Sequence, residues 1–300
     1  MKIFAIVVTY NGMKWYDKCF LSLFQSTMPI DVVVVDNAST DGTREYIRHH
    51  FPQIALIESK ENLGFAKANN MGIKYALSHQ ADYFFLLNQD AWIETDTIPS
   101  LVSTFDMVES IGIASPIHLN GVGSGLDCRF AQYMPWQFVS DMFVSQLKPT
   151  YICNFVNAAA WMISRKCIET VGGFNTDIFI HRGEDVNYCH RIQYHGFKLV
   201  VNTQCCIYHD RQERIDNPNN EADSAFKKEN RDLGLRIRYC NPCQPINVAP
   251  IIRNNKRRIF LQLFQLKFKK IKEIKQQNKF IQETSASREH SKSKGLLWLE

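Results

Sequence analysis

The feature that most constrains the fold is a regular alternation of short apolar runs and helical stretches over the first 115 residues. The runs at 2–9 (KIFAIVVT) and 31–36 (DVVVVD) are rich in β-branched residues, as strands buried on both faces of a sheet should be. Further strands are predicted at 54–58, 82–87 and 111–115, and helices at 14–26, 43–50, 65–79 and 96–109. This order predicts an α/β fold with a mostly parallel, Rossmann-like twisted sheet flanked by helices on right-handed crossovers.

Polar side chains follow three of these strands at the point where each strand ends. The first strand runs into Thr9-Tyr10-Asn11, the second into Asp36-Asn37 and the fourth into Asn88-Gln89-Asp90. In such sheets ligands bind outside the carboxyl ends of the strands. One aspartate at this edge can hold a ribose or a base, and a second can hold a divalent cation that bridges a diphosphate. The alternative for each single aspartate is that it caps the turn or helix that follows.

The second half of the chain has a weaker pattern. Residues 118–150 mix glycine, aromatic residues and two prolines without a clear period, and we expect a long loop or lid there. A central strand at 155–164, a helix at 184–194 and a strand at 198–202 are predicted after it. Glu184 and Asp185 begin that helix, where the helix dipole favours acidic residues in any case.

Several nucleotide-binding and metal-binding classes are excluded or disfavoured by the motifs. No GxGxxG follows the first strand, and the glycine-dense segment 121–125 neither follows a good strand nor opens a helix, so a dinucleotide-binding fold is not predicted. No GxxxxGK[ST] motif occurs, which excludes a P-loop kinase or ATPase. Cys240 and Cys243 form a lone CxxC without the second pair of ligands that zinc needs.

Cysteine usage and the lack of a long apolar run predict a cytoplasmic location. Nine cysteines is an odd number, so a secreted disulfide framework is not expected. The longest early apolar run, 3–8, is too short for the core of a signal peptide or for a membrane span.

Charge is distributed unevenly along the chain. The net charge is +5, but residues 251–300 carry 13 Lys/Arg against 4 Asp/Glu, a net of +9, which leaves −4 for residues 1–250. Between 251 and 279 apolar residues recur at steps of three and four, so a helix there would carry an apolar stripe flanked by lysines. Such a helix can lie on an anionic membrane surface, or its stripe can pack on the rest of the chain or on a second copy in a homodimer. Nucleic acid is not expected, because no aromatic stacking platform or known binding motif accompanies the charge.

Five segments resemble, in order and in normal spacing, the successive motifs of family 2 glycosyltransferases with the GT-A fold. They are VVTYNG (7–12), VVDNASTDGT (34–43), NLGFAKANNMGI (62–73), LLNQDAWI (86–93) and the block 172–200 with Tyr208-His209 after it. The chain most resembles the rhamnosyltransferase-like group of that family. The resemblance divides it into a catalytic domain at 1–215, with a nucleotide-sugar half to about 115 and an acceptor half after it. A helical extension at 216–282, basic and amphipathic from 251, and a flexible Ser/Lys-rich tail at 283–300 are expected to follow.

The resemblance implies a donor site made from the first four motifs. Its residues would be Thr9, Tyr10, Asn11, Asp36, Asn37, Gly64, Lys67, Asn69 and Asn88. Thr9, Tyr10 and Asn11 would line the nucleobase site, Asp36 would bind the base or ribose, and the glycine, lysine and second asparagine would border the ribose and diphosphate. Asp90 stands at the last position of the family's DxD motif and would bind Mg²⁺ or Mn²⁺, with His209 as a further ligand.

The pair Glu184-Asp185 matches the family's ED motif and implies the catalytic acids. An inverting transfer needs a base that takes the proton of the acceptor hydroxyl as it attacks the anomeric carbon. Asp185 would be that base, with Glu184 in reserve or bound to acceptor hydroxyls. Trp136 and Trp161 could stack on sugar rings, although such residues more often belong to a core.

The expected function is therefore an inverting, metal-dependent hexosyl or deoxyhexosyl transfer in cell-surface polysaccharide assembly. The donor would be a UDP-, dTDP- or GDP-linked sugar, and the acceptor a glycan or a lipid-linked glycan. The enzyme would be cytoplasmic, or peripheral on the inner face of the membrane through 251–279. The alternatives are a nucleotidyltransferase, which would show a Gly-rich, Lys/Arg-bearing loop after the first strand, and a non-catalytic nucleotide-sugar-binding relative.

Overall fold

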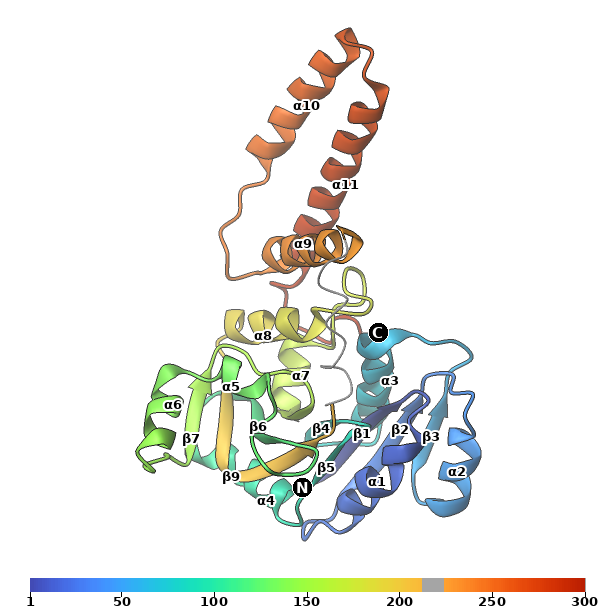
Figure 1. Ribbon diagram of the computed structural model, residues 1–300, viewed down its shortest axis with the longest axis vertical. Coiled ribbons are helices and arrows are strands. Elements are labelled where there is room, and N and C mark those ends of the chain that lie inside the picture. Colours follow the sequence, from blue (N-terminus) through green and yellow to red (C-terminus); the bar gives the residue numbers. More distant parts are fainter. Residues whose placement is uncertain (212–223, 300) are drawn as a thin grey trace.

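A computed structural model describes residues 1–211 and 224–299 (Figure 1). The strands are β1 (Ile3–Thr9), β2 (Asp31–Asp36), β3 (Ala55–Glu58), β4 (Tyr83–Asn88), β5 (Ala91–Ile93), β6 (Ile111–Asn120), β7 (Thr150–Cys153), β8 (Ala160–Ser164) and β9 (Lys198–His209). The helices are the 3-10 turn η1 (Met13–Trp15), α1 (Tyr16–Phe24), α2 (Thr43–His50), α3 (Gly64–Ser78), α4 (Thr97–Met107), α5 (Phe130–Tyr133), α6 (Trp136–Phe143), α7 (Arg165–Val171), α8 (Glu184–Tyr194), α9 (Ser224–Cys240), α10 (Ala249–Phe264) and α11 (Phe268–His290). Within the described residues the strands form one sheet in the order β3-β2-β1-β4-β8-β6-β9-β5, with β7 on β9.

The first half of the sheet is the parallel layer that the sequence predicts. β3, β2, β1 and β4 pair in parallel, with Thr9 opposite Asp36 and Val8 opposite Asn88. The polar ends of three strands therefore meet at one edge, as expected. Helices pack on both faces: α1, α2 and α4 contribute to one apolar core and α3, α7 and α8 to the other. The expected α/β fold, with a mostly parallel sheet in its first half and helices on both faces, is confirmed.

The second half of the sheet is mixed and more ordered than predicted. β8 pairs antiparallel with β4 and β6, while β9 pairs parallel with β6 and antiparallel with β5 and β7. The central strand is shorter than predicted and begins at Ala160. The interpretation of 118–150 as one long loop is wrong, because this segment contains the end of β6, the short helices α5 and α6, and the start of β7. Irregular hydrophobic spacing here reflects short elements rather than their absence.

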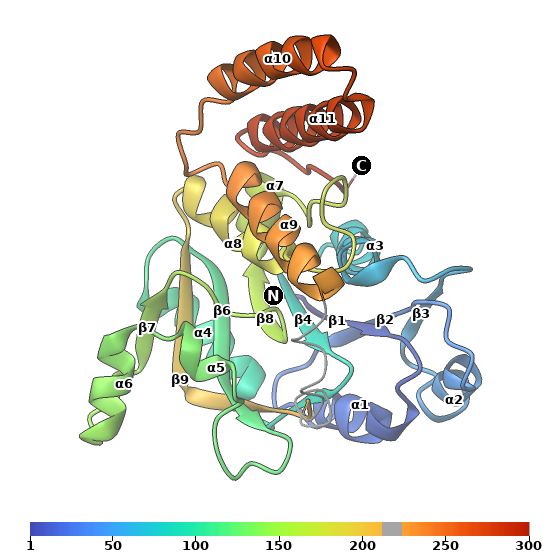
Figure 2. The ribbon, with the colours of Figure 1, turned by 45° about the horizontal axis from the view of Figure 1, so that its top comes forward.

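The predicted basic helix at 251–282 is a hairpin of two helices. α10 ends at Phe264, the chain turns through Leu266 at a φ of 48°, and α11 returns from Phe268. Both helices stand away from the sheet, on the far side of α9 and α8 (Figures 1 and 2). No helix of the described residues combines the length and apolarity needed to cross a membrane.

The expectation of a flexible tail at 283–300 is wrong for the described residues up to 299. α11 continues to His290, and the segment after it returns to the α/β domain, where Leu297 and Leu299 are buried. The Gly173 N–H donates to the Leu297 carbonyl at 2.8 Å, and Trp298 Nε1 donates to Asp177 at 2.8 Å. The Ser/Lys-rich composition is misleading because Ser287 and Ser291 are buried and hydrogen-bonded.

The cysteines form no disulfide among the described residues, and all nine are free thiols. Cys240 is buried and its thiol donates to the Thr284 carbonyl, whereas Cys243 is exposed. The described residues contain no group of three or more His, Cys, Asp and Glu side chains that could hold a metal ion by itself.

Candidate active site

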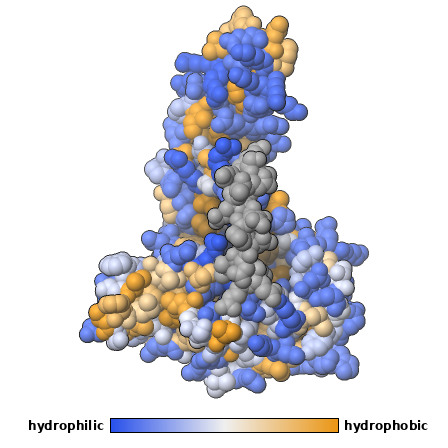
Figure 3. All heavy atoms as spheres, in the orientation of Figure 1, coloured by the Kyte–Doolittle hydropathy of each residue, from blue (hydrophilic) through white to orange (hydrophobic). Residues whose placement is uncertain are grey.

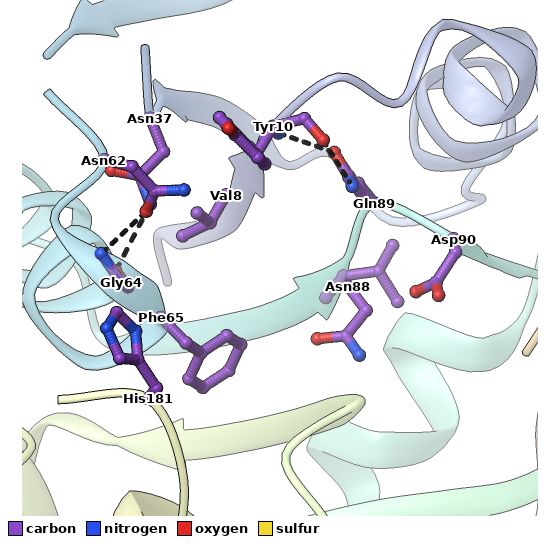
Figure 4. Close-up of a pocket in the computed structure, with 11 residues that line it drawn as sticks. Val8, Tyr10, Asn37, Asn62, Gly64, Phe65, Asn88, Gln89, Asp90 and His181 are labelled. Carbon is purple, nitrogen blue, oxygen red and sulfur yellow. Dashed lines mark hydrogen bonds between the residues drawn. The ribbon is translucent and has the colours of Figure 1, made fainter. Parts of the chain in front are cut away.

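A pocket of about 280 Å³ lies at the edge where β1, β2 and β4 end (Figure 4). Its lining residues are Val8, Tyr10, Asn37, Asn62, Gly64, Phe65, Leu87, Asn88, Gln89, Asp90 and His181. Tyr10, Asn37, Gly64 and Asn88 belong to the donor site that the family resemblance implies, and Asp90 is the metal ligand that it implies. Asn62, Phe65 and Gln89 lie within the same motifs but were not singled out, and His181 comes from the loop before α8.

An asparagine network shapes one wall of the pocket. The Asn37 side chain donates to Asn62 Oδ1 at 2.9 Å and accepts the Leu63 N–H at 2.7 Å, and Asn62 Oδ1 also accepts the Gly64 N–H at 3.0 Å. Gly64 opens α3 at a φ of 77°, and a side chain there would strike the Ile180 carbonyl at 2.4 Å. Glycine is therefore required where the loop before α8 crosses the start of α3.

The remaining residues of the expected donor site lie around the pocket rather than on its surface. Thr9 is buried, and the Asn69 amide donates to the Phe65 carbonyl inside its own helix. Asn11 accepts the Thr40 N–H at 2.8 Å and so fixes the turn after β2. Lys67 lines a separate hollow of about 290 Å³ beside Asn62.

Asp36 is fully buried at the end of β2. Its carboxylate accepts the Ser39 N–H at 3.1 Å and lies 3.3 Å from the Arg44 guanidinium. It therefore holds the turn that carries the wall of the pocket, as the capping alternative proposes. Its role as a ligand to the base or ribose stays a prediction.

Asp90 and His209 meet on the far side of the pocket, because β5 places Ala91 opposite His209 in β9. His209 is fully buried, and its Nε2 lies 3.4 Å from Asp90 Oδ1. Its other ring nitrogen, Nδ1, lies 3.2 Å from Asp127 Oδ2. We call Asp90, Asp127 and His209 the metal corner.

Asp127 is a functional candidate that the sequence interpretation missed. It is buried, and besides His209 it contacts Arg211 at 3.3 Å and accepts the Arg129 N–H at 2.9 Å. Burial opposes its ionised form, yet the close contact with His209 and the charge of Arg211 lower its pKa to about 2. Burial likewise opposes the charged form of His209, but the close contacts with the Asp127 and Asp90 carboxylates raise its pKa. A carboxylate behind a histidine orients the ring for a metal on its other side.

The donor set at the metal corner fits Mg²⁺ or Mn²⁺. One carboxylate oxygen, from the turn between β4 and β5, and one imidazole nitrogen, from the end of β9, lie 3.4 Å apart, and Asp90 lines the pocket. Magnesium is usually bound through one or two protein carboxylates, with substrate phosphates and water in the other positions. The lack of a third acidic or histidine ligand among the described residues is compatible with such a site.

The acidic pair, Glu184 and Asp185, begins α8 after Gly183, which caps the helix at a φ of 87°. Glu184 is buried, and burial raises its pKa to about 7. Burial also raises the pKa of Asp185, against the opposing effect of the Val186 N–H, which donates to it at 2.8 Å. Carboxylates with raised pKa values are better proton acceptors than exposed ones.

The two tryptophans considered as sugar platforms have opposite environments. Trp161 on β8 is fully buried and stacks on Phe174 and Tyr188, so it belongs to the core. Trp136 at the start of α6 is 80% exposed.

Comparison with protein families and curated proteins gives matches over most of the catalytic fold. The model of the family "Glycosyl transferase family 2" matches residues 4–172. A dTDP-rhamnosyl transferase of Shigella flexneri is 26% identical over 206 residues, which cover 66% of this chain and 66% of that protein. A low-salt glycan biosynthesis hexosyltransferase of Haloferax volcanii is 29% identical over 171 residues, which cover 54% of this chain and 52% of that protein. The match thus spans about two thirds of the first relative and half of the second.

Solved structures share the fold at low sequence identity. A mannosyltransferase of Pyrobaculum calidifontis in complex with GDP-Man and Mn²⁺ superposes with a TM-score of 0.55 at 18% identity, over 97% of this chain and 88% of that one. S. aureus TarS 1-349 in complex with UDP superposes with a TM-score of 0.55 at 17% identity, over 83% of this chain and 68% of that one.

Proposed function

Since the chain belongs to glycosyl transferase family 2, we propose that it is an inverting glycosyltransferase with a nucleoside-diphosphate sugar as donor. The observation that carries the proposal is that the pocket at the strand ends lies next to the loop before the Glu184-Asp185 pair. The pocket at the strand ends and the loop that leads into the acidic pair share His181. A donor held in the pocket would therefore present its sugar towards the start of α8.

The nucleotide would lie against the β1, β2 and β4 ends, between Tyr10 and the Asn37–Asn62 wall. The diphosphate would extend towards Asn88 and Asp90. Asp90 and His209 would hold Mg²⁺ or Mn²⁺, which when bound would stabilise the charge of the departing nucleoside diphosphate. Asp127, which lies 3.2 Å from His209 Nδ1, would keep the His209 ring in the orientation that this role needs.

Asp185 is the proposed base. As the acceptor hydroxyl attacks the anomeric carbon, its proton would pass to the Asp185 carboxylate while the bond to the diphosphate breaks on the opposite face. Glu184 lies deeper, and with a pKa of about 7 it is partly protonated at neutral pH. It would then be suited to donating or accepting a hydrogen bond with an acceptor hydroxyl.

A second pocket, of about 340 Å³, lies next to the donor pocket and also includes His181. Its lining residues are Ile180, His181, Arg182, Glu229, Asp232, Leu233 and Arg236, which come from the loop before α8 and from α9. Charged side chains next to Ile180 and Leu233 suit the hydroxyl-rich and apolar faces of a sugar. We assign the acceptor, a glycan or a lipid-linked glycan, to this pocket, with a role in cell-surface polysaccharide assembly.

The donor is tested by thermal shift. Melting temperatures are measured with UDP-, dTDP- and GDP-linked sugars in the presence and absence of Mn²⁺, because a ligand that binds only the native state must raise the melting temperature. One class of donor is expected to stabilise the chain more with Mn²⁺ than without. If none of them does so, the donor assignment fails.

The nature of the reaction is tested by the products. Slow release of nucleoside diphosphate from the donor is expected without acceptor and would distinguish a glycosyltransferase from both alternatives. A nucleotidyltransferase would release pyrophosphate from a nucleoside triphosphate, and a non-catalytic relative would release nothing. We place the enzyme in the cytoplasm or at the inner face of a membrane, where a lipid-linked acceptor would be reached; homodimer formation stays a prediction.

A further inference from the structure

The end of the α10–α11 hairpin exposes a concentrated group of large apolar side chains. We call it the apolar tip: Phe260, Leu261, Leu263, Phe264, Leu266 and Phe268. Their exposed fractions run from 47% at Leu263 to 74% at Phe264. Figure 3 shows these hydrophobic residues at the end of the molecule farthest from the catalytic fold. A group of this size on a water-soluble surface indicates a binding site.

The apolar tip contributes none of the buried residues of the hairpin. Ile271 and Ile274 of α11 are buried, and they are the part of the predicted stripe that folding uses. Asn255 is the buried residue of α10, and its amide donates to Asn278 of α11 at 2.8 Å. The stripe predicted from the sequence is thus divided into a buried part, in the first two turns of α11, and an exposed part around the interhelical turn.

Basic side chains surround the apolar tip. Between residues 249 and 282 the chain has ten Lys/Arg and one acid, Glu273. All ten basic residues are exposed: Arg253, Lys256, Arg257, Arg258, Lys267, Lys269, Lys270, Lys272, Lys275 and Lys279. Among the described residues, salt bridges engage only Lys279, with Glu283. The apolar tip therefore has a collar of positive charge that the protein itself does not neutralise.

The combination of apolar tip and basic collar selects one kind of partner. A second copy would bring two collars of like charge together, which opposes association through this surface. Nucleic acid would match the charge but leave the apolar side chains in water. An anionic bilayer satisfies both, since its interface accepts aromatic and aliphatic side chains and its headgroups attract lysine and arginine.

We propose that the α10–α11 hairpin attaches the protein to anionic membranes by inserting the apolar tip into the bilayer interface, with the basic collar at the headgroups. This differs from the flat-lying helix that the sequence pattern suggests, because Ile271 and Ile274 are not available to the membrane. The inference rests on the peripheral location in the proposed function, but not on the transfer chemistry.

The test is co-sedimentation of the full chain with vesicles of mixed phosphatidylcholine and phosphatidylglycerol, compared with vesicles of phosphatidylcholine alone. Wild type is expected to bind the anionic vesicles, and less so at high salt. The triple variant Phe260→Ser, Phe264→Ser, Leu266→Ser is expected to lose at least about tenfold in binding. The variant Lys267→Gln, Lys269→Gln, Lys270→Gln is expected to lose about fivefold for each lysine and to become less sensitive to salt.

The protein offers a matched control. Trp136 and Phe143 on α6 are 80% and 90% exposed, but residues 130–147 around them in the sequence contain no lysine or arginine. The variant Trp136→Ser, Phe143→Ser should bind vesicles as wild type does. Loss of binding in this control with retention in the triple variant would overturn the proposal, as would a wild type that never binds at low salt.

A light-scattering measurement without vesicles tests whether a second copy of the chain, rather than a membrane, covers the apolar tip. If wild type is a dimer and the triple variant a monomer, the apolar tip is an interface between copies and the proposal fails. Donor hydrolysis by the triple variant and by the lysine variant in solution should equal that of wild type. If neither wild type nor any variant hydrolyses the donor, the proposed transfer reaction is contradicted, but the proposed membrane site is not.

Discussion

Asp127 of the metal corner and Glu184 of the acidic pair are both buried carboxyl groups, but their surroundings shift their proton affinities in opposite directions. In the metal corner, Asp127 faces His209 and Arg211, and its pKa falls to about 2. In the acidic pair, burial dominates and raises the pKa of Glu184 to about 7. The difference lies in the partners, since a burial penalty is present at both sites.

This contrast suits the two sites to different roles, metal binding in the metal corner and proton transfer at the acidic pair. A carboxylate that supports a metal ligand must stay ionised at every working pH, whereas a carboxylate that takes a proton works best with a pKa near that pH. Carboxyl groups whose environments move their pKa values apart are a common sign of divided roles in an active site. The metal corner is therefore expected to respond to substitution mainly in affinity, and the acidic pair mainly in turnover and in pH dependence.

The largest expected effect is that of Asp185→Asn, which keeps the shape of the side chain but cannot accept a proton. Transfer should fall by roughly 10²–10⁴-fold, while the melting-temperature shift produced by donor and Mn²⁺ is retained. The measurement is the rate of glycosylated product formation beside the thermal shift. If Asp185→Asn stays active and Glu184→Gln is inactive, the two acids have exchanged roles.

The second effect is on stability. The pKa of Glu184 is about 7 in the folded chain against an ordinary value of 4.5, so folding favours its protonated form. Stability from this group is fully present below pH 4.5 and is lost as the pH rises towards 7, by roughly 3 kcal/mol in all. Glu184→Gln should therefore be more stable than wild type above pH 7, and the difference should disappear near pH 4.

Urea unfolding of both proteins across this pH range measures the difference. The exposed Glu45→Gln serves as the control, because its side chain is 74% exposed and no large pH-dependent difference from wild type is expected. A constant difference between wild type and Glu184→Gln at all pH values would show that Glu184 is not held in its protonated form by folding.

The regions with strong local patterns could be predicted from the sequence. β2 and α8 begin and end at the predicted residues. Their signals, a run of β-branched residues and a glycine before a helical pattern, lie within or directly beside the segment itself. The sequence also predicted that Tyr10, Asn37, Asn88 and Asp90 meet at one edge, since parallel strands bring their ends together, whereas Gly64 was expected there only from the family resemblance.

The wrong predictions concern segments whose structure depends on contacts with distant parts of the chain. The turn at Leu266 divides the predicted basic helix, and only contact between α10 and α11 determines which part of its stripe is buried. The composition of residues 283–300 predicts a flexible tail. Instead, the Asn70 amide donates to the Trp298 carbonyl at 3.1 Å, although the two residues are 228 positions apart in the sequence. No local pattern reports such a partner.

Asp127 is the clearest case of a missed residue, and it provides the smallest of the expected effects. It lies in the segment without a period, and its link to His209 joins positions far apart in the sequence. Asp127→Asn keeps an oxygen that can accept from His209 but removes the charge that pairs with Arg211. Affinity for Mn²⁺ in the presence of donor should fall about 10–100-fold, which is typical when the residue behind a metal-bound histidine is changed. The measurement is a Mn²⁺ titration of the donor-dependent thermal shift.

Asp141→Asn is the matched control for this substitution, because Asp141 is also a buried acid that accepts a hydrogen bond, from Tyr151 at 2.7 Å, but does not line the pocket. Asp141→Asn should leave Mn²⁺ affinity unchanged even if it lowers stability. Equal loss in both variants would attribute the effect to general destabilisation, and no loss in Asp127→Asn would mean that His209 does not depend on Asp127 to bind the metal. Only a loss of Mn²⁺ affinity confined to Asp127→Asn supports the proposed metal site, because Asp127 contacts His209 and Asp141 does not.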